Sequence, residues 1–377
     1  MNKSEFIQKY KEPLQAFSEM SQKAGSRSDF VQGGGGNTSV KLDDQLMAIK
    51  ASGFRLDQIT EATAYAVLDY QRIRSFYKHT SPQQINDIEA AGSAKTKTSI
   101  YTVTDLESLR PSVEAGFHAM LDRFVLHSHS VYANLAACSE QGRETAKQAL
   151  AELEEPFVFV PYINPGAQLT FAIDQARQQE ADEKGRLPAV LFMENHGLII
   201  TGDDEKYCLE LHQKVNEKLA AAYQTSDRDW PSIQLEAIKA DSKTLYLSQT
   251  DWLRKRIKHN DWNLELFMTQ ALYPDQLVFL TGQMAEVDKG SASAYLERAG
   301  SLPAKATLFR ESGDIIYDCG KVEAKTMEET LCAIFFIHEK IKAASQVVRT
   351  MDEAGKEFIR NWESEKYRKQ VAGKDTK

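Results

Sequence analysis

Residues 124–132 read FVLHSHSVY, an alternating stretch that predicts a β-strand. Because successive side chains of a strand point to opposite faces, we expect His127 and His129 on one face, together with Val125. Two imidazoles side by side on a rigid strand are a suitable beginning for a zinc site. The alternative interpretation is a pair of histidines with ordinary hydrogen bonds in the core or at the surface.

A third histidine stands at a predicted tight turn. Residues 189–202 read AVLFMENHGLIITG, which predicts two hydrophobic strands joined at Asn195, His196 and Gly197. A turn at the end of buried strands can project one side chain into a cleft. There His196 would complete three protein ligands and leave one coordination position open for substrate. The alternative is a turn residue that tolerates an unusual backbone conformation.

A carboxylate precedes the histidine strand. Residues 111–122, PSVEAGFHAMLD, predict a helix entered through Pro111. Near a metal, Glu114 could act as a general base or fill a coordination position until substrate displaces it. His118 follows four residues later on the same helical face, and we expect it to support the site or the packing rather than to bind metal. The other histidines show no partner pattern and are interpreted as incidental: His79, His212, His259 and His338.

A glycine-rich hairpin over residues 29–53 offers candidates for binding a phosphate. It contains VQGGGGNTSVKL, a turn at Asp43-Asp44 and LMAIKASG. The loop has neither the ending of a P-loop nor the spacing of a dinucleotide fingerprint. Backbone N–H groups and short polar side chains can still form an anion nest, and a predicted helix start at Ser112 could add to it. The alternative is a simple turn. The candidate phosphate-binding residues are Gly36, Asn37, Thr38, Ser52, Gly53 and Ser112.

The composition is that of a globular protein. The 377 residues are 42% hydrophobic and 27% charged, and the length predicts one large domain plus a smaller one. The net charge of −8 argues against nucleic acid or an anionic membrane as the main partner, although a positive pocket could still bind an anionic substrate. The four cysteines are far apart and form no Cys-x-x-Cys pair. Without an apolar run of signal-peptide or membrane-spanning type, we expect a cytoplasmic protein.

A polar segment at residues 224–233 predicts a domain boundary. We expect a catalytic domain over residues 1–228 and a smaller C-terminal α+β extension, of unknown role, over residues 229–377. In the first part the patterns predict helices at 2–24, 60–77, 133–150 and 201–223, a strand at 158–163 and a loop at 80–100. In the second they predict helices at 235–258, 261–271, 290–299, 326–346 and 351–371, a strand at 276–280 and a hairpin at 305–318.

Six segments, taken in order, resemble the class II aldolase/adducin family. They are GGGGNTSVKL (33–42), AIKASG (48–53), RPSVEAGFHAML (110–121), VLHSHSVYANLAA (125–137), FVPYINPG (159–166) and LFMENHGLIITG (191–202). The resemblance covers roughly residues 20–222. It implies an α/β protein with the three-layer α/β/α class II aldolase fold around a mostly antiparallel sheet. It also implies a homo-oligomer that binds Zn²⁺, or another divalent metal, at a cleft between subunits.

Carried over by position, the resemblance implies roles for individual residues. The metal ligands would be His127, His129, His196 and Glu114, with Glu114 also the acid or base. Tyr162, matched through a Pro-Tyr dipeptide alone, corresponds to a tyrosine that donates a proton from a neighbouring subunit in fuculose-phosphate aldolases. Asn37, Ser52, Gly53 and Ser112 fall at phosphate-contact positions.

The sequence also departs from the family pattern. Val113 stands where many members have a second serine, which removes one phosphate-binding hydroxyl. The motifs are similar to the aldolase half of rhamnulose-phosphate aldolase/dehydrogenase fusions, yet no glycine fingerprint of a dinucleotide domain follows them.

The activity implied by the resemblance is zinc-dependent, reversible aldol cleavage of a ketose 1-phosphate to dihydroxyacetone phosphate and an aldehyde. A sugar-phosphate 4-epimerase or dehydratase on the same scaffold is one alternative. A non-catalytic, adducin-like binding module is another, but such a module is expected to lack the histidines and the acid that this chain retains.

Overall fold

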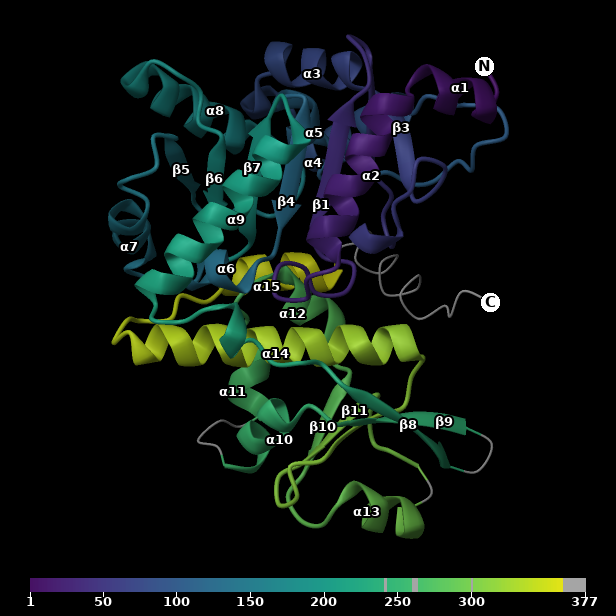
Figure 1. Cartoon of the computed structure of the whole chain (residues 1–377), viewed down its shortest axis with the longest axis vertical. Coiled ribbons are helices and arrows are strands. Elements are labelled where there is room, and N and C mark those ends of the chain that lie inside the picture. Colours follow the sequence, from purple (N-terminus) through teal and green to yellow (C-terminus); the bar gives the residue numbers. More distant parts are fainter. Residues whose placement is uncertain (241–242, 260–263, 300, 362–377) are drawn as a thin grey trace.

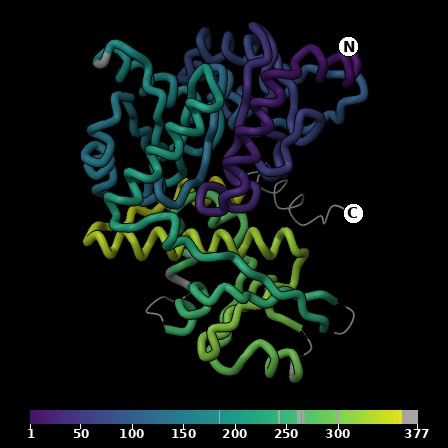
Figure 2. Tube along the Cα trace, in the orientation of Figure 1, coloured from purple at the N-terminus to yellow at the C-terminus, as the bar shows by residue number. Residues whose placement is uncertain are grey.

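Two β-sheets form the framework of the molecule, one of seven strands and one of five. The computed structural model describes residues 1–240, 243–259, 264–299 and 301–361. Helix α14 (Lys321–Ala343) lies between the part that contains the first sheet and the part that contains the second (Figure 1). After building the second sheet, the chain returns through α14 and α15 (Glu353–Asn361) toward the first (Figure 2).

The seven-stranded sheet is mostly antiparallel, as predicted. Only its β5–β6 edge pair is parallel, and the other neighbouring pairs are antiparallel. In spatial order its strands are β3 (Tyr65–Asp69), β2 (Leu46–Lys50), β1 (Asn37–Lys41), β4 (Phe124–Ser128), β7 (Gly197–Gly202), β6 (Val190–Met193) and β5 (Phe157–Val160).

Helices cover both faces of this sheet, which confirms the predicted three-layer α/β/α fold. One face packs against α2 (Lys11–Gly25), α6 (Val131–Ala137) and α9 (Glu205–Ala222). The other packs against α3 (Tyr70–His79), α5 (Ala115–Met120) and α8 (Ala167–Lys184). The remaining helices of this part are α1 (Lys3–Lys9), α4 (Ile88–Thr98) and α7 (Gly142–Ala149).

Strand alternation assigns the side chains of β4 to these two faces. Leu126 joins the core beneath α2 and α9, whereas Val125 packs with Phe117 of α5. His127 therefore lies on the α5 face, where its ring meets Phe117 edge-on. The predicted sharing of a face by Val125 and His127 is confirmed.

Several expected elements in the first part differ in the structure. The segment 60–77 opens with strand β3 before helix α3, because β3 pairs along its whole length with β2. The predicted loop at 80–100 contains helix α4, which Asp87 caps by accepting a hydrogen bond from the backbone N–H of Ala90. Helix α8 follows the strand at 157–160 and was not predicted.

The second sheet confirms a C-terminal region of mixed α and β content. Its strands, in spatial order, are β10 (Met284–Val287), β11 (Ala306–Phe309), β12 (Ile315–Tyr317), β9 (Lys243–Ser248) and β8 (Leu235–Ala240). The hairpin predicted at 305–318 is β11–β12. The helices of this region, besides α14 and α15, are α10 (Asp251–Lys258), α11 (Leu264–Thr269), α12 (Pro274–Phe279) and α13 (Ala292–Ala299).

Two predictions in this region were wrong. The helix expected at 235–258 is the β8–β9 hairpin followed by α10, because pairing with β12 overrides the local helix preference. The strand expected at 276–280 is α12, which begins at Pro274 and is buried on every side, so its sequence carries no helical period. The predicted helix at 351–371 is α15 up to Asn361, and its remainder lies outside the described residues, as do residues 261–263 of the helix predicted at 261–271.

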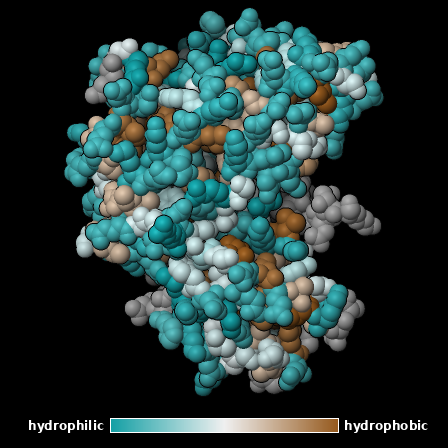
Figure 3. Space-filling view, in the orientation of Figure 1, coloured by the Kyte–Doolittle hydropathy of each residue, from teal (hydrophilic) through white to brown (hydrophobic). Residues whose placement is uncertain are grey.

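The largest hydrophobic cluster crosses the predicted boundary at 228/229. Phe336 of α14 packs edge-on against Tyr132 of α6 and against Trp230. The face of the molecule in Figure 3 is mostly hydrophilic, with hydrophobic residues scattered over both its upper and its lower half. Among the helices that the structure describes, none is both long enough and apolar enough to cross a lipid bilayer.

Candidate metal centre

Three histidines converge although they are far apart in sequence. Strand β4 carries His127, its end carries His129, and the β6–β7 turn carries His196. The antiparallel pairing of β4 with β7 brings that turn beside the two β4 histidines. One nitrogen from each ring lies within 4.8 Å of the others, and the three residues are only 0 to 3% exposed. Asn195 takes a left-handed conformation with φ of 50°, which allows the sharp turn.

Hydrogen bonds fix which nitrogen of each β4 ring faces the centre. Nδ1 of His127 lies 3.0 Å from the carbonyl oxygen of Leu198, and Nδ1 of His129 lies 2.5 Å from a carboxylate oxygen of Asp275. Both partners accept hydrogen bonds, so each Nδ1 carries the proton and donates it. A neutral imidazole that donates from Nδ1 has its lone pair at Nε2, which is the form that binds metal.

The two Nε2 atoms lie only 3.1 Å apart. Two lone pairs at this distance repel each other unless a proton or a cation lies between them. Burial lowers the pKa of His127 to about 4, so a proton on this ring is unfavourable at neutral pH. The arrangement therefore fits a bound cation.

Glu114 brings a carboxylate to the same place. It immediately precedes α5 and is 6% exposed. One of its oxygens lies 3.7 Å from Nε2 of His127, and the other lies 3.3 Å from Nε2 of His196. This second oxygen, Oε1, is buried and accepts no hydrogen bond from any residue that the structure describes. Three imidazoles and a carboxylate are a donor set that suits Zn²⁺ and related divalent ions, which would also satisfy Oε1.

A chain of hydrogen bonds orients Glu114. The amide nitrogen of Asn37 donates to the carboxylate at 2.5 Å, and the amide oxygen of Asn37 accepts from Nε2 of His118. Nδ1 of His118 then accepts from the hydroxyl of Ser39 at 2.7 Å. Burial lowers the pKa of His118 well below its ordinary value, so the ring stays neutral. His118 thus supports the site through Asn37, in agreement with its sequence interpretation.

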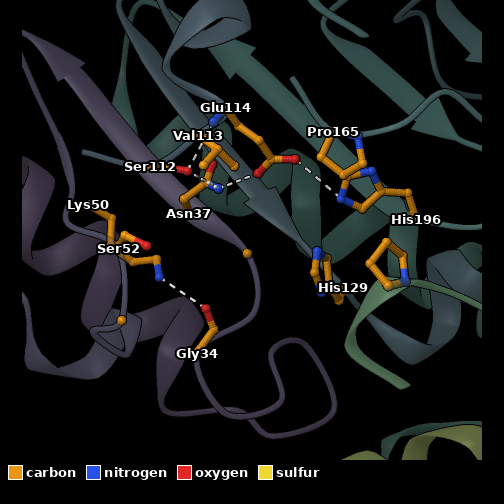
Figure 4. A pocket seen from close by; sticks show the side chains of 13 residues that line it. Gly34, Asn37, Lys50, Ser52, Ser112, Val113, Glu114, His129, Pro165 and His196 are labelled. Atoms are coloured by element: carbon orange, nitrogen blue, oxygen red, sulfur yellow. Dashed lines mark hydrogen bonds and ion pairs between the residues drawn. The ribbon is translucent and has the colours of Figure 1, made fainter. Parts of the chain in front are cut away.

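Most of the candidate phosphate-binding residues share one pocket with this cluster. Figure 4 shows Lys50 and Ser52 on one side of the pocket and His129 and His196 on the other. The Gly-rich loop lies close against β4, because a Cβ on Gly36 would stand 2.6 Å from the carbonyl oxygen of His127. The candidates that line the pocket are Gly36, Asn37, Ser52, Gly53 and Ser112.

Thr38 requires a correction. Strand alternation turns its side chain to the opposite face of the sheet, where its hydroxyl bonds with Ser21 at 2.7 Å. The hydroxyl therefore cannot reach the pocket.

A second correction concerns Ser112, which precedes α5 by three residues instead of starting the helix. It lines the pocket through its own hydroxyl, 3.1 Å from the amide nitrogen of Asn37, and not as part of a helix N-terminus.

Tyr162 does not line the pocket of its own chain. Its ring packs among apolar residues of α12 and α15, and its hydroxyl donates to Asn164 at 3.2 Å. A role across a subunit interface stays a prediction.

Sequence analysis missed two contributors to the site. Lys50 is 3% exposed, lines the pocket, and donates hydrogen bonds to the carbonyl oxygens of Gly34 and Phe54 at 3.1 and 2.7 Å. A lysine at the end of an apolar strand beside the Gly-rich loop was the available signal. The second contributor is the pair Pro274 and Asp275 at the start of α12, which no motif marked.

The fold is that of the class II aldolase family, and the pocket holds a histidine group that could bind a metal. The family described as the class II aldolase and adducin N-terminal domain matches residues 15–223, more than half of the chain. The chain therefore belongs to the class II aldolase and adducin family. No curated protein matches the sequence at a significant level.

Solved structures with the same fold are distant in sequence. The N-terminal class II aldolase domain of a conserved protein from Thermoplasma acidophilum is 22% identical, with a TM-score of 0.45, over 55% of this chain and 92% of its own. YgbL from Klebsiella pneumoniae is 16% identical, with a TM-score of 0.38, over 61% and 93%. A sugar-phosphate aldolase from Thermotoga maritima is 13% identical, with a TM-score of 0.40, over 57% and 96%.

Acid should destabilise the metal-free protein. Burial lowers the pKa of His127 to about 4 and that of His212, which bonds to Ser128, to about 3. Both rings titrate near pH 6.5 when unfolded, so the unfolded chain binds more protons below that pH. The free energy of unfolding should therefore decrease as the pH falls from about 6.5 to about 4, by about 1.4 kcal/mol per pH unit for each ring.

Urea unfolding with a chelator across this range measures the loss. The variant His212→Gln should flatten the pH dependence by about one proton. An unchanged slope would show that His212 is not held neutral in the folded chain.

Proposed function

We propose that this protein cleaves a ketose 1-phosphate reversibly into dihydroxyacetone phosphate and an aldehyde, with Zn²⁺ or another divalent ion as cofactor. One observation carries the proposal. Glu114 and two members of the buried histidine cluster, His129 and His196, line a single pocket together with Lys50 and a set of small polar groups. The pocket thus combines a candidate metal site, a candidate acid or base, and a candidate anion site.

The position of Lys50 in the pocket favours a substrate that carries a phosphate. Its ammonium group is nearly closed to solvent, and a buried cation is favourable only with hydrogen-bond acceptors or an anion nearby. Ser52 and Ser112 bring hydroxyls into the same pocket. A phosphate held by these groups would fix the position of the sugar carbons relative to Glu114, which is a large part of catalysis when two groups must meet.

In the proposed reaction two side chains, Glu114 and Tyr162, transfer protons. A divalent ion bound by the histidines would supply a Lewis acid that stabilises the negative charge developing as the C3–C4 bond breaks. The electron pair of that bond stays with C3, and Glu114 delivers a proton to C3. The proton of the C4 hydroxyl leaves to a base as the aldehyde forms, and the proposed acceptor is the phenolate of Tyr162 from a neighbouring subunit. Asn37, held by His118, keeps the carboxylate of Glu114 in place throughout.

A screen of ketose 1-phosphates with coupled detection of dihydroxyacetone phosphate tests the activity. We expect release of the three-carbon product that a chelator abolishes and added divalent metal restores. Glu114→Gln should retain metal but lose most turnover, about 10²–10⁴-fold, because it removes the proton donor. His129→Ala should lose both metal and turnover.

Full activity in either variant would overturn these roles. An epimerase or dehydratase would transform the substrate without releasing the three-carbon product. An adducin-like binding module would show no turnover with any substrate.

Removal of the charge on Lys50 should weaken the binding of phosphorylated substrates. Lys50→Met is expected to raise KM by about 10- to 100-fold, since a hydrogen bond to a charged group contributes about 1.5–3 kcal/mol. Lys41→Met is a matched control, because Lys41 is also buried on this sheet but donates to the carbonyl oxygens of Leu121 and Asp122 outside the pocket. An equal rise of KM for an unphosphorylated analogue would contradict the phosphate contact.

We also propose a cytoplasmic homo-oligomer with the active site at a subunit interface. The four cysteines are all free thiols, which agrees with a reducing compartment. If Tyr162 serves a neighbouring subunit, mixing Glu114→Gln with Tyr162→Phe should form hybrid oligomers that recover part of the activity. A monomer by sedimentation, or no recovery after verified subunit exchange, would contradict the shared site.

A further inference from the structure

A carboxylate from the C-terminal region lies against the histidine cluster. Asp275 is the second residue of α12 and is fully buried. Its Oδ2 accepts the hydrogen bond from Nδ1 of His129 at 2.5 Å. A buried carboxylate is unfavourable unless its partners compensate for the lost water, so this contact strongly constrains both side chains.

The contact also bears on what His129 can do. With its Nδ1 proton directed at Asp275, the ring presents a lone pair at Nε2, on the side of His127. A carboxylate that accepts from the far nitrogen fixes the tautomer and the orientation of a metal-binding histidine and makes its lone pair more basic. The geometry around Asp275 is therefore the one expected for a group that prepares a metal ligand.

The Gly-rich loop is shaped around this pair. A Cβ on Gly35 would overlap Oδ2 of Asp275 and would lie 2.8 Å from Nδ1 of His129. Glycine at this position allows the loop to pack directly against His129 and Asp275, and both side chains are buried. Pro274, which precedes Asp275, lines the pocket itself. The first turn of α12 is thus a wall of the site.

Further hydrogen bonds connect the C-terminal region to the residues around the histidine cluster. The side-chain amide of Asn195, beside His196, donates to the carbonyl oxygens of Leu272 and Arg349 at 2.8 and 2.9 Å. The backbone N–H of Gly33 donates to the buried carboxylate of Glu329 in α14 at 2.9 Å. The C-terminal region therefore contacts the turn of the third histidine and the Gly-rich loop as well as His129.

We infer that Asp275 is a positioning residue of the metal centre, and that the region after residue 228 is a structural part of this centre. The inference deepens the proposed function and rests on its metal site. It gives a role to the region that sequence patterns left without one.

Metal titration of the full-length, metal-free protein tests the inference, with Zn²⁺ and Co²⁺ as the probes. Asp275→Asn should bind each ion about 10- to 100-fold more weakly than the parent protein, which is the usual effect of losing such a partner. Its Co²⁺ visible absorption bands should also shift, because the ligand field of His129 changes. A residue needed only for folding would leave these bands unchanged in the folded fraction.

Glu328→Gln is the matched control. Glu328 is equally buried in the C-terminal region, but its carboxylate bonds to Ser248 and Tyr317, away from the pocket. This variant should keep the parent affinity within about threefold, a difference of less than 1 kcal/mol.

The outcomes separate the inference from the proposed function. If the parent protein binds neither ion, the proposed metal function fails. If the parent binds and Asp275→Asn binds equally well, the inference is overturned while the proposed function stands. If Asp275→Asn does not fold, NMR of the parent decides. The Nδ1 proton of His129, assigned by its loss in His129→Ala, should be strongly deshielded, and its absence would overturn the inference.

Discussion

The arrangement of the site follows from two imidazole nitrogens that face each other 3.1 Å apart in a region closed to solvent. Nδ1 of each ring donates to an acceptor on the far side, a carbonyl oxygen for His127 and a carboxylate for His129. Lone pairs held this way are unfavourable together, and they become favourable when a cation binds between them. The carboxylate of Glu114 and the hydrogen bonds from Nδ1 of His127 and His129 are arranged around this pair of nitrogens.

Buried polar groups form hydrogen bonds on both faces of the sheet at the neighbouring strands β1 and β4. On one face, Ser39 and His118 hold Asn37 against the carboxylate of Glu114. On the other, the hydroxyl of Ser128 bonds with His212 of α9 at 2.7 Å. Both supporting rings are neutral because burial lowers their pKa. These hydrogen bonds add no charge on either face, so the charged groups beside the histidines are Glu114, Asp275 and Lys50.

Local sequence was sufficient to predict the first half of this arrangement. The alternation around His127 and the turn at His196 are short-range patterns, so the strands and their faces could be predicted from them, whereas the three-layer fold was implied by the resemblance to the class II aldolase/adducin family. The same alternation excludes the side chain of Thr38, but only once the start of β1 at Asn37 is known. Lys50 ends strand β2 of the predicted hairpin, so its position beside the Gly-rich loop could have been inferred from the pairing of β1 with β2, although it was missed.

The contribution of the C-terminal region could not be predicted in this way. Asp275 lies 146 residues from His129 in sequence, in a six-residue helix buried on every side. Such a segment has no amphipathic period. Strands β8 and β9 owe their conformation to pairing with each other, and β9 also pairs with β12, instead of to local preference. Only tertiary contacts show where these residues lie.

The position of Asp275 in the chain has a consequence for how the protein is made. A ribosome completes His127, His129 and His196 well before it reaches α12, and α14 comes later still. During that interval the nascent chain carries three imidazoles but lacks the acceptor that selects the tautomer of His129. The hydrogen bond from His129 to Asp275 can form only after the last third of the polypeptide has begun to emerge, so the order of synthesis sets the earliest moment at which the histidine cluster can be complete.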